Sequence, residues 1–352
     1  MLHLTRLVAP LCLLLSVFAL AACGGSEDGE ATATTATTGE EPAKELRVGL
    51  ITDLGQLDDA GFNELAFRGI QQAERELGIK SRVIESASAA DYIPNMTSLA
   101  RQDYDLVIGV GFAQGDAIGK VAQRFPETKF AIIDVDHAFV PGKPANVQGL
   151  LFREEEVGYL VGYLAGLVEK RRQGADVISA VGGMKEPPVD RFIAGYFAGA
   201  EKSAPGIETI LDYSQDWDDQ AKCKELALNQ IARGSNVVFQ VAGGCGLGAL
   251  NAAGERDRWG IGVDADQSFL GPHILTSAQK GVDSAVLLTI TSIQDGTWKG
   301  GGNATFGLKE DGVGLGKVSP DVPDEDIERI EQIKQQISDG EITGIPTEVG
   351  KS

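Results

Sequence analysis

The stretch "VGLITDLGQLDDAGFNELAFRGI", residues 48–70, decides the fold class. It passes from an apolar run, typical of a buried strand, into a segment with apolar residues at helical spacing. Three carboxylates, Asp53, Asp58 and Asp59, lie at the junction, and Asn63 follows them. Such a turn could bind a metal ion, hold the hydroxyls of a sugar, or cap the helix.

The same strand-to-helix alternation continues through most of the chain. Alternating units of this kind form a parallel sheet covered by helices. There are more strands than one such domain usually holds, so the sequence predicts an α/β protein with two doubly wound lobes. No fixed-period repeat is visible, and "ATFGLKEDGVGLGKV", residues 304–318, predicts a β-hairpin. We expect strands at Leu46–Thr52, Arg82–Glu85, Leu106–Val110, Phe130–Val135, Val177–Val181, Thr209–Leu211, Val237–Val241, Gly260–Val263 and His273–Thr276.

The first 23 residues have the features of an export signal. Arg6 precedes a nearly continuous apolar run that ends in small residues at "LAAC", residues 20–23. This ending resembles the lipobox of bacterial lipoproteins, which implies lipidation of Cys23; the alternative is an ordinary secretory signal with an incidental cysteine. Residues 24–44 contain no large apolar side chain, so we expect a flexible tether. The sequence therefore predicts a protein anchored by lipid to the extracytoplasmic face of the cell membrane.

The composition narrows the function. A formal net charge of −20 argues against a nucleic-acid partner, because such surfaces carry clustered Lys and Arg. The three histidines lack the spacing of a zinc site, and no G-x-S-x-G nucleophile motif is present. We therefore expect a binding protein, not an enzyme, with no metal and no cofactor.

Ligands of open α/β sheets bind beyond the carboxyl ends of the strands. Polar and aromatic residues recur at these ends, so two lobes facing each other across them would form a cleft. These residues are Asp53, Phe112, Asp134, Asp136, Trp217 and Asp264.

Cys223 and Cys245 remain after the two cysteines of the export region, Cys12 and Cys23, are set aside. Cys223 lies in the first turns of a helix that starts near Asp218, and Cys245 follows the next strand. In a strand–helix–strand unit both positions fall at the carboxyl edge of the sheet. We hypothesise a disulfide, which an oxidising compartment permits; two reduced thiols are the alternative.

Six segments follow one another along the chain: "GLITDLGQLDDAGFNELAFRG", "DLVIGVGF", "FAIIDVD", "EEEVGYLVGYLAG", "VFQVAGGCGLG" and "GVDADQSFL". Together they resemble the basic membrane protein family of bacterial lipoproteins, which includes purine nucleoside receptors of ABC transporters. The resemblance covers residues 46–294 in order and implies the type I periplasmic-binding-protein fold, two lobes joined by three crossovers. The lobes would comprise residues 45–150 plus 265–300 and residues 151–264 plus 301–352, with crossovers near residues 150, 265 and 300.

The resemblance also implies a set of ligand contacts. Phe62 and Trp217 would sandwich a base, although Trp217 stands where nucleoside receptors would carry Phe. Asp264 would accept the ribose hydroxyls beside Lys280. The implied set comprises Asp53, Phe62, Asn63, Asp136, Trp217, Gly244, Asp264 and Lys280, with Phe112 and Asp134 as secondary members. The implied partners are a nucleoside and a membrane permease, and we expect a monomer.

Other interpretations stay open. Asp53 and Asp59 could cap a helix, Phe62 could belong to the core, and Asp264 could form a structural turn. The protein could also be a sensor, or bind another small polar ligand such as a sugar or signal molecule. A calcium-dependent nucleoside hydrolase has a similar acidic N-terminus, but here Ile51 replaces the leading Asp and the spacing to the Asp pair is one residue too long.

Overall fold

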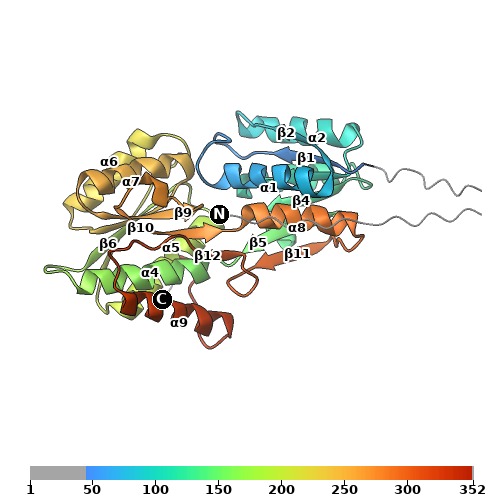
Figure 1. Ribbon diagram of the computed structural model, residues 1–352. Helices are drawn as coiled ribbons and strands as arrows, with labels where there is room; N and C mark the ends of the chain where they lie inside the picture. The colour runs from blue at the N-terminus through green and yellow to red at the C-terminus, as the bar shows by residue number, and fades with distance from the viewer. Residues whose placement is uncertain (1–44, 351–352) are drawn as a thin grey trace, which may run out of the picture. The chain divides into compact units, whose positions relative to one another are not determined.

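Two six-stranded sheets with the same pattern of strand order carry the fold in the computed structural model, which describes residues 45–350 (Figure 1). The strands of the first sheet, all parallel, run in the order β11 (Gly302–Phe306), β5 (Val147–Phe152), β4 (Lys129–Ile133), β3 (Leu106–Gly109), β1 (Arg47–Ile51) and β2 (Lys80–Ile84). The second sheet runs β12 (Val313–Leu315), β10 (Ile274–Lys280), β9 (Trp259–Asp264), β8 (Val237–Val241), β6 (Val177–Gly182) and β7 (Glu208–Tyr213). Only β12 is antiparallel to its neighbour, β10, among the described strands.

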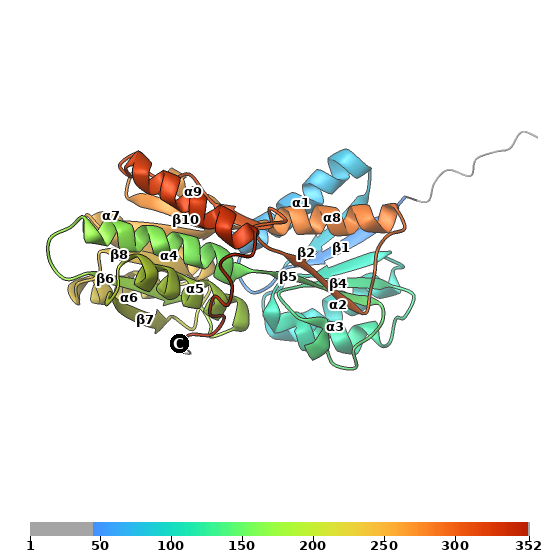
Figure 2. The same cartoon turned by 90° about the horizontal axis from the view of Figure 1, so that it is seen from below.

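Helices cover both faces of each sheet, as expected for parallel strands linked by crossovers. In the first lobe α1 and α8 lie side by side on one face, and α2 and α3 lie on the other (Figure 2). In the second lobe α4 packs on α5 and α9, and α6 packs on α7. The helices are α1 (Phe62–Leu77), α2 (Tyr92–Arg101), α3 (Gly115–Ala122), α4 (Glu154–Lys170), α5 (Pro187–Ser203), α6 (Gln220–Ala232), α7 (Gly243–Glu255), α8 (Val282–Gln294) and α9 (Asp324–Ser338). In the described chain, no helix is long and apolar enough to cross a membrane.

The two-lobed architecture expected from the sequence is confirmed, and the predicted strands lie within a few residues of the observed ones. Strand β5 was not predicted, because the sequence around it reads as the break between the two series. The β-hairpin prediction for residues 304–318 is wrong. Its two halves enter different sheets, where β11 pairs with β5 and β12 pairs with β10.

The chain passes between the lobes three times, close to Arg153, Gly281 and Gly307. These positions differ from the lobe boundaries expected from the sequence. Strand β10 belongs to the second sheet, although residues 265–300 were assigned to the first lobe, and β11 belongs to the first sheet. The reason is physical: an edge strand is specified by the partner it pairs with, and a short run of residues carries no mark of that partner. The signal segment, Cys23 and the tether lie outside the described residues.

Glycines let α4 and α5 approach closely. Gly158, Gly162 and Gly166 recur every fourth residue and so lie on one face of α4. A Cβ atom on Gly162 would lie 1.9 Å from the carbonyl oxygen of Tyr196 in α5, and one on Gly158 would lie 2.3 Å from that of Phe192. The backbones are therefore in contact, which fixes the position of α5 and of Phe192 at its start.

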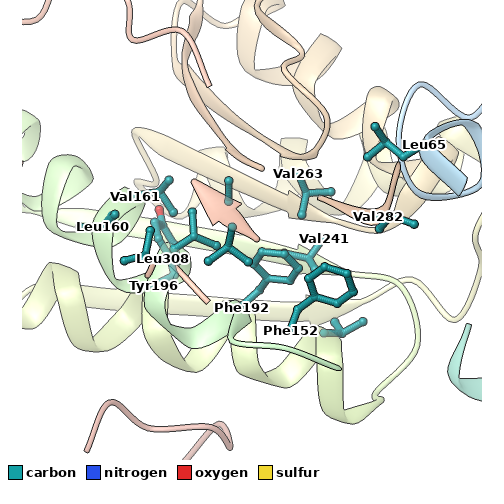
Figure 3. Close-up of a cluster of buried hydrophobic side chains, with 14 of the residues drawn as sticks. Leu65, Phe152, Leu160, Val161, Phe192, Tyr196, Val241, Val263, Val282 and Leu308 are labelled. Atoms are coloured by element: carbon teal, nitrogen blue, oxygen red, sulfur yellow. The ribbon is translucent and has the colours of Figure 1, made fainter. Parts of the chain in front are cut away.

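The apolar core of the second lobe continues toward the first at this level. Figure 3 shows Phe152, at the end of β5, beside Phe192 of α5, with Val241 and Val263 from neighbouring strand ends. All four side chains are buried. Phe192 and Phe152 therefore form a rigid apolar wall at the junction of the lobes.

A disulfide joins Cys223 in α6 to Cys245 in α7, with their Cα atoms 5.6 Å apart. It is the pairing hypothesised from the sequence. Cys223 lies in the first turn of α6, as expected, and Cys245 follows β8 in the first turn of α7. Cys245 N–H also donates to the carbonyl of Trp217, at 2.8 Å. The bridge and this hydrogen bond together fix the loop that carries Trp217.

We predict that Gly162→Ala lowers the free energy of unfolding by about 1–3 kcal/mol, because the added methyl group overpacks the α4–α5 contact. Gly314→Ala is the matched control: a Cβ there meets no atom within 4 Å, so its effect should stay within about 0.5 kcal/mol. Urea unfolding of both variants measures the difference. Equal stability of the two variants would contradict the close contact.

Candidate ligand-binding site

One cavity is lined by the carboxyl-end residues of both sheets. From the first lobe come residues that follow β1, β3 and β4, and from the second come residues that follow β6, β7, β8 and β9. The lining combines carboxylates, one ammonium group and several aromatic rings. Its members are Asp53, Leu54, Gly55, Asp59, Phe62, Asn63, Gly111, Phe112, Asp134, Glu186, Pro188, Val189, Phe192, Trp217, Val241, Gly243, Gly244, Val263, Asp264 and Lys280.

Asp53 leaves β1 pointing into this cavity with one oxygen already bonded. Its Oδ1 accepts from the Tyr92 hydroxyl at 2.6 Å and from Leu54 N–H at 2.7 Å. Gly111, at φ +102°, packs so closely that a Cβ there would lie 1.9 Å from Asp53 Oδ2. Burial raises the pKa of Asp53 to about 6, although both hydrogen bonds act in the opposite direction. No described protein group donates a hydrogen bond to Oδ2, so this oxygen remains an acceptor for a bound molecule.

The other polar residues of the turn between β1 and α1 form hydrogen bonds within the turn itself. Asp59 accepts from the backbone N–H groups of Gly61, Asn63 and Glu64 and so caps α1. The side chain of Asn63 accepts from Asp53 N–H and donates to Asp59. Asn63 lines the cavity as expected, but its amide serves mainly to orient Asp53. Of the three interpretations of this turn, helix capping holds for Asp59.

Lys280 is the centre of a buried ionic cluster. It is 2% exposed, and its Nζ donates to both oxygens of Asp134 at 2.7 and 2.8 Å. Glu154 Oε1 lies 2.9 Å from the same Nζ and forms a second ion pair with it. Burial would lower the pKa of Lys280, but Asp134, Glu154 and Asp264 together raise it above its usual value. The ammonium therefore stays charged.

Aromatic rings surround the same ammonium. The Nζ of Lys280 lies 5.1 Å from the ring centre of Phe62, 4.9 Å from that of Phe152 and 5.8 Å from that of Phe192. These distances are those of cation–π contacts, which add to the stabilisation of a desolvated charge.

Asp264 ends β9 with its carboxylate unpaired in the described structure. Its backbone has φ +62°, its side chain lines the cavity, and no hydrogen bond to it is formed by a protein group. Burial raises its pKa to about 7, against the opposing effect of Lys280. Lys280 does lie nearby, as expected, but its ion pairs are with Asp134 and Glu154. A buried acceptor without a partner is costly, so this carboxylate is suited to a ligand donor.

Phe62 at the start of α1 and Trp217 in the loop before α6 line the cavity from different lobes. The Trp217 ring rests on Gly183, where a Cβ would meet it at 2.2 Å. Gly244 lies beside it at the start of α7. Phe112 also lines the cavity and is 36% exposed. The flat apolar surfaces needed to stack on a ring are thus present on both sides.

The structure reverses the order in which the sequence analysis placed two aspartates, Asp136 and Asp134. Asp134 lines the cavity, whereas Asp136, the member of the main expected set, does not. Asp136 accepts from Ala138 N–H and Asn303 Nδ2, each at 2.8 Å, and so holds a turn. At φ +69° the backbone of Asp134 is left-handed and directs its side chain to Lys280.

Sequence reasoning missed two carboxylates. Glu154, the first residue of α4, is fully buried beside Lys280. Glu186 lines the cavity just before α5, where burial and the charges of Asp53 and Asp134 raise its pKa to about 7. The double proline that follows Glu186 was the available signal, because it marks a helix start at a strand's carboxyl end.

The cavity holds acceptors and rings in an arrangement that suits a neutral, donor-rich aromatic molecule. Within residues 45–350, no group of three or more His, Cys, Asp or Glu side chains is placed to hold a metal ion.

Comparisons with known proteins identify the family of the chain. Residues 46–346 match the family model described as "ABC transporter substrate-binding protein PnrA-like". The "ABC transporter nucleoside-binding protein BmpA" of Lactococcus lactis is 33% identical over 354 residues, covering 94% of this chain and 95% of the relative. An "uncharacterized lipoprotein" of Pyrococcus horikoshii is 32% identical over 330 residues, covering 86% and 80%.

Among solved structures, an ABC transporter solute-binding protein from Aeropyrum pernix superposes with a TM-score of 0.78 at 29% identity, covering 86% of this chain and 94% of that one. The family model extends over both lobes and all three crossovers described above. The chain therefore belongs to the Bmp family of PnrA-like ABC transporter substrate-binding proteins.

Proposed function

We propose that this protein binds ribonucleosides, most favourably purine ribonucleosides, in the cavity between its lobes and delivers them to a membrane permease. The observation that carries the proposal is the unpaired carboxylate of Asp264, buried in a cavity that Phe62 and Trp217 also line. We further propose that lipidation of Cys23 anchors it to the outer face of the membrane.

A nucleoside joins a flat aromatic face to a polyol, and the cavity offers a match for each part. Stacking of a base on aromatic side chains contributes about 1–3 kcal/mol per base. The two oxygens of Asp264 can accept from the vicinal 2′- and 3′-hydroxyls, and a hydrogen bond to a charged group contributes about 1.5–3 kcal/mol. A deoxynucleoside would leave one carboxylate oxygen without a donor, so it should bind more weakly.

Further acceptors favour a base that carries N–H donors. Asp53 Oδ2 and the side chain of Glu186 face the cavity without a hydrogen bond from the described protein groups. Purines present ring N–H or amino donors at their polar edge, and these acceptors can accept hydrogen bonds from them. The nucleoside-binding relative from Lactococcus lactis supports a nucleoside as the ligand.

Ligand contacts from both lobes favour the closed arrangement, since the open arrangement lacks them. The three passages of the chain between the lobes form the hinge for such closure. A lipid tether would keep the loaded protein near its permease at a high effective concentration.

Calorimetric titration of residues 24–352, which lack the signal segment and the lipidation site Cys23, with analysis of the products by chromatography tests the proposal directly. The titrants are ribonucleosides, deoxynucleosides, free bases, ribose and arabinose. Tight binding of intact ribonucleosides supports it. Release of free base would establish a hydrolase instead, and binding of sugars alone would establish a sugar-binding protein.

We predict that Asp264→Asn weakens ribonucleoside binding at least about 100-fold, because the acceptor loses its charge and one of its two acceptor oxygens becomes an NH2 donor. Asp136→Asn should leave the affinity unchanged, since Asp136 lies outside the cavity. The same titration measures both variants, and thermal unfolding shows that each is folded. Equal effects of the two substitutions would remove Asp264 from the site.

We predict that binding releases protons near pH 7. The pKa of Asp264 is about 7 without ligand, and hydroxyl donors favour the ionised form, so affinity should fall about tenfold for each pH unit below 7. Titrations in buffers of different ionisation enthalpy measure the protons released. Asp264→Asn should abolish the share of the release that belongs to Asp264, whereas Glu186→Gln, which removes another carboxyl with a pKa of about 7, should preserve that share. Constant affinity from pH 5 to 8 would contradict the assignment.

A further inference from the structure

One short pattern, D-x-D-x-x-F, occurs once in each lobe, 130 residues apart. It is "DVDHAF" at residues 134–139 and "DADQSF" at residues 264–269. The first follows β4 and the second follows β9, and both strands are third in the order of their sheets. The two segments therefore occupy equivalent places in the two lobes.

The equivalence extends to the backbone and to the hydrogen bonds. Asp134 and Asp264 are both left-handed, at φ +69° and +62°, and both line the cavity. Two residues later, Asp136 accepts from Ala138 N–H at 2.8 Å, and Asp266 accepts from Ser268 N–H at 3.1 Å. Each segment then forms a single 3-10 turn, His137–Phe139 in one lobe and Ser268–Leu270 in the other.

A side chain from a nearby strand forms hydrogen bonds with each segment. Asn303 of β11 accepts from His137 N–H and donates to Asp136, both at 2.8 Å. In the other lobe, Ser277 of β10 accepts from Gln267 N–H at 3.0 Å. The turns are therefore held firmly, yet neither places its phenylalanine in the core.

Phe139 is 80% exposed and Phe269 is 67% exposed. A single exposed apolar residue needs no explanation. Here, however, a phenylalanine is exposed at the equivalent place in both lobes. Each lies on a hydrogen-bonded turn that follows a carboxylate of the cavity, so the repeated exposure calls for an explanation. Rigidly held aromatic side chains are typical anchors of protein interfaces.

We propose that Phe139 and Phe269 form a two-point docking surface for the membrane-spanning part of the transporter. A pair of equivalent anchors, one per lobe, fits a partner that offers two equivalent apolar pockets. Because one ring belongs to each lobe, lobe closure sets the distance between them, so such a partner would distinguish the loaded form from the empty one. The identity of the partner rests on the proposed delivery to a permease.

The contact can be mapped in cells of the native host with the full lipidated chain. Photoreactive benzoylphenylalanine is placed at position 139, 269 or 288. Leu288 is the matched control, being 55% exposed on α8 and outside the repeated pattern. We predict adducts with a transmembrane subunit of an ABC importer from positions 139 and 269, and none from position 288. Adducts only with lipid or with a second copy of this chain would overturn the proposal.

Nucleoside uptake by cells measures the effect of losing the docking surface. The double variant Phe139→Ser/Phe269→Ser should lower nucleoside uptake by cells at least tenfold, while the purified variant binds nucleoside within twofold of the wild-type affinity. Leu288→Ser should change neither quantity. Unchanged uptake by the double variant would overturn the docking surface. Failure of the wild-type chain to bind nucleosides would refute the proposed ligand, and the adducts would still decide the surface.

Discussion

The site depends on the buried ammonium group of Lys280. It lies at the end of β10 in the second lobe, and its ion-pair partner Asp134 comes from β4 in the first. A charge removed from water is tolerated only when it is paired, so Asp134 and Glu154 have to stay close to it. The cluster thereby links the lobes through charge. Asp264, which lines the cavity near Lys280, accepts no hydrogen bond from the described protein groups.

This arrangement divides the acidic residues of the cavity into two groups with different work. Asp59 and Asp134 are bonded by helix amides or by the ammonium, so they hold the site together. Asp53, Glu186 and Asp264 keep oxygens free, and burial raises the pKa of each toward neutrality. A donor-rich neutral ligand relieves the second group without disturbing the first, which is why ligand specificity and structural stability can be changed separately here.

The sequence predicted the features that depend on local residue patterns, and it missed those that depend on which strands pair. Apolar runs and strand-end carboxylates predicted the two lobes and the placement of Asp53, Asp264 and the disulfide pair. It could not show which sheet β10 or β11 would join, because an edge strand takes its identity from a distant partner. It also gave Asp136 precedence over Asp134, since two aspartates in one turn differ only in the backbone angles that aim them.

The late exchange of strands between the lobes bears on how the chain matures. Each sheet receives one edge strand, β11 or β12, from the segment between Gly302 and Leu315. Neither sheet is complete while that segment is still being made, although most of the other strands are available much earlier. The two lobes therefore finish folding together, and the cavity between them takes its final form only when nearly the whole chain has been synthesised.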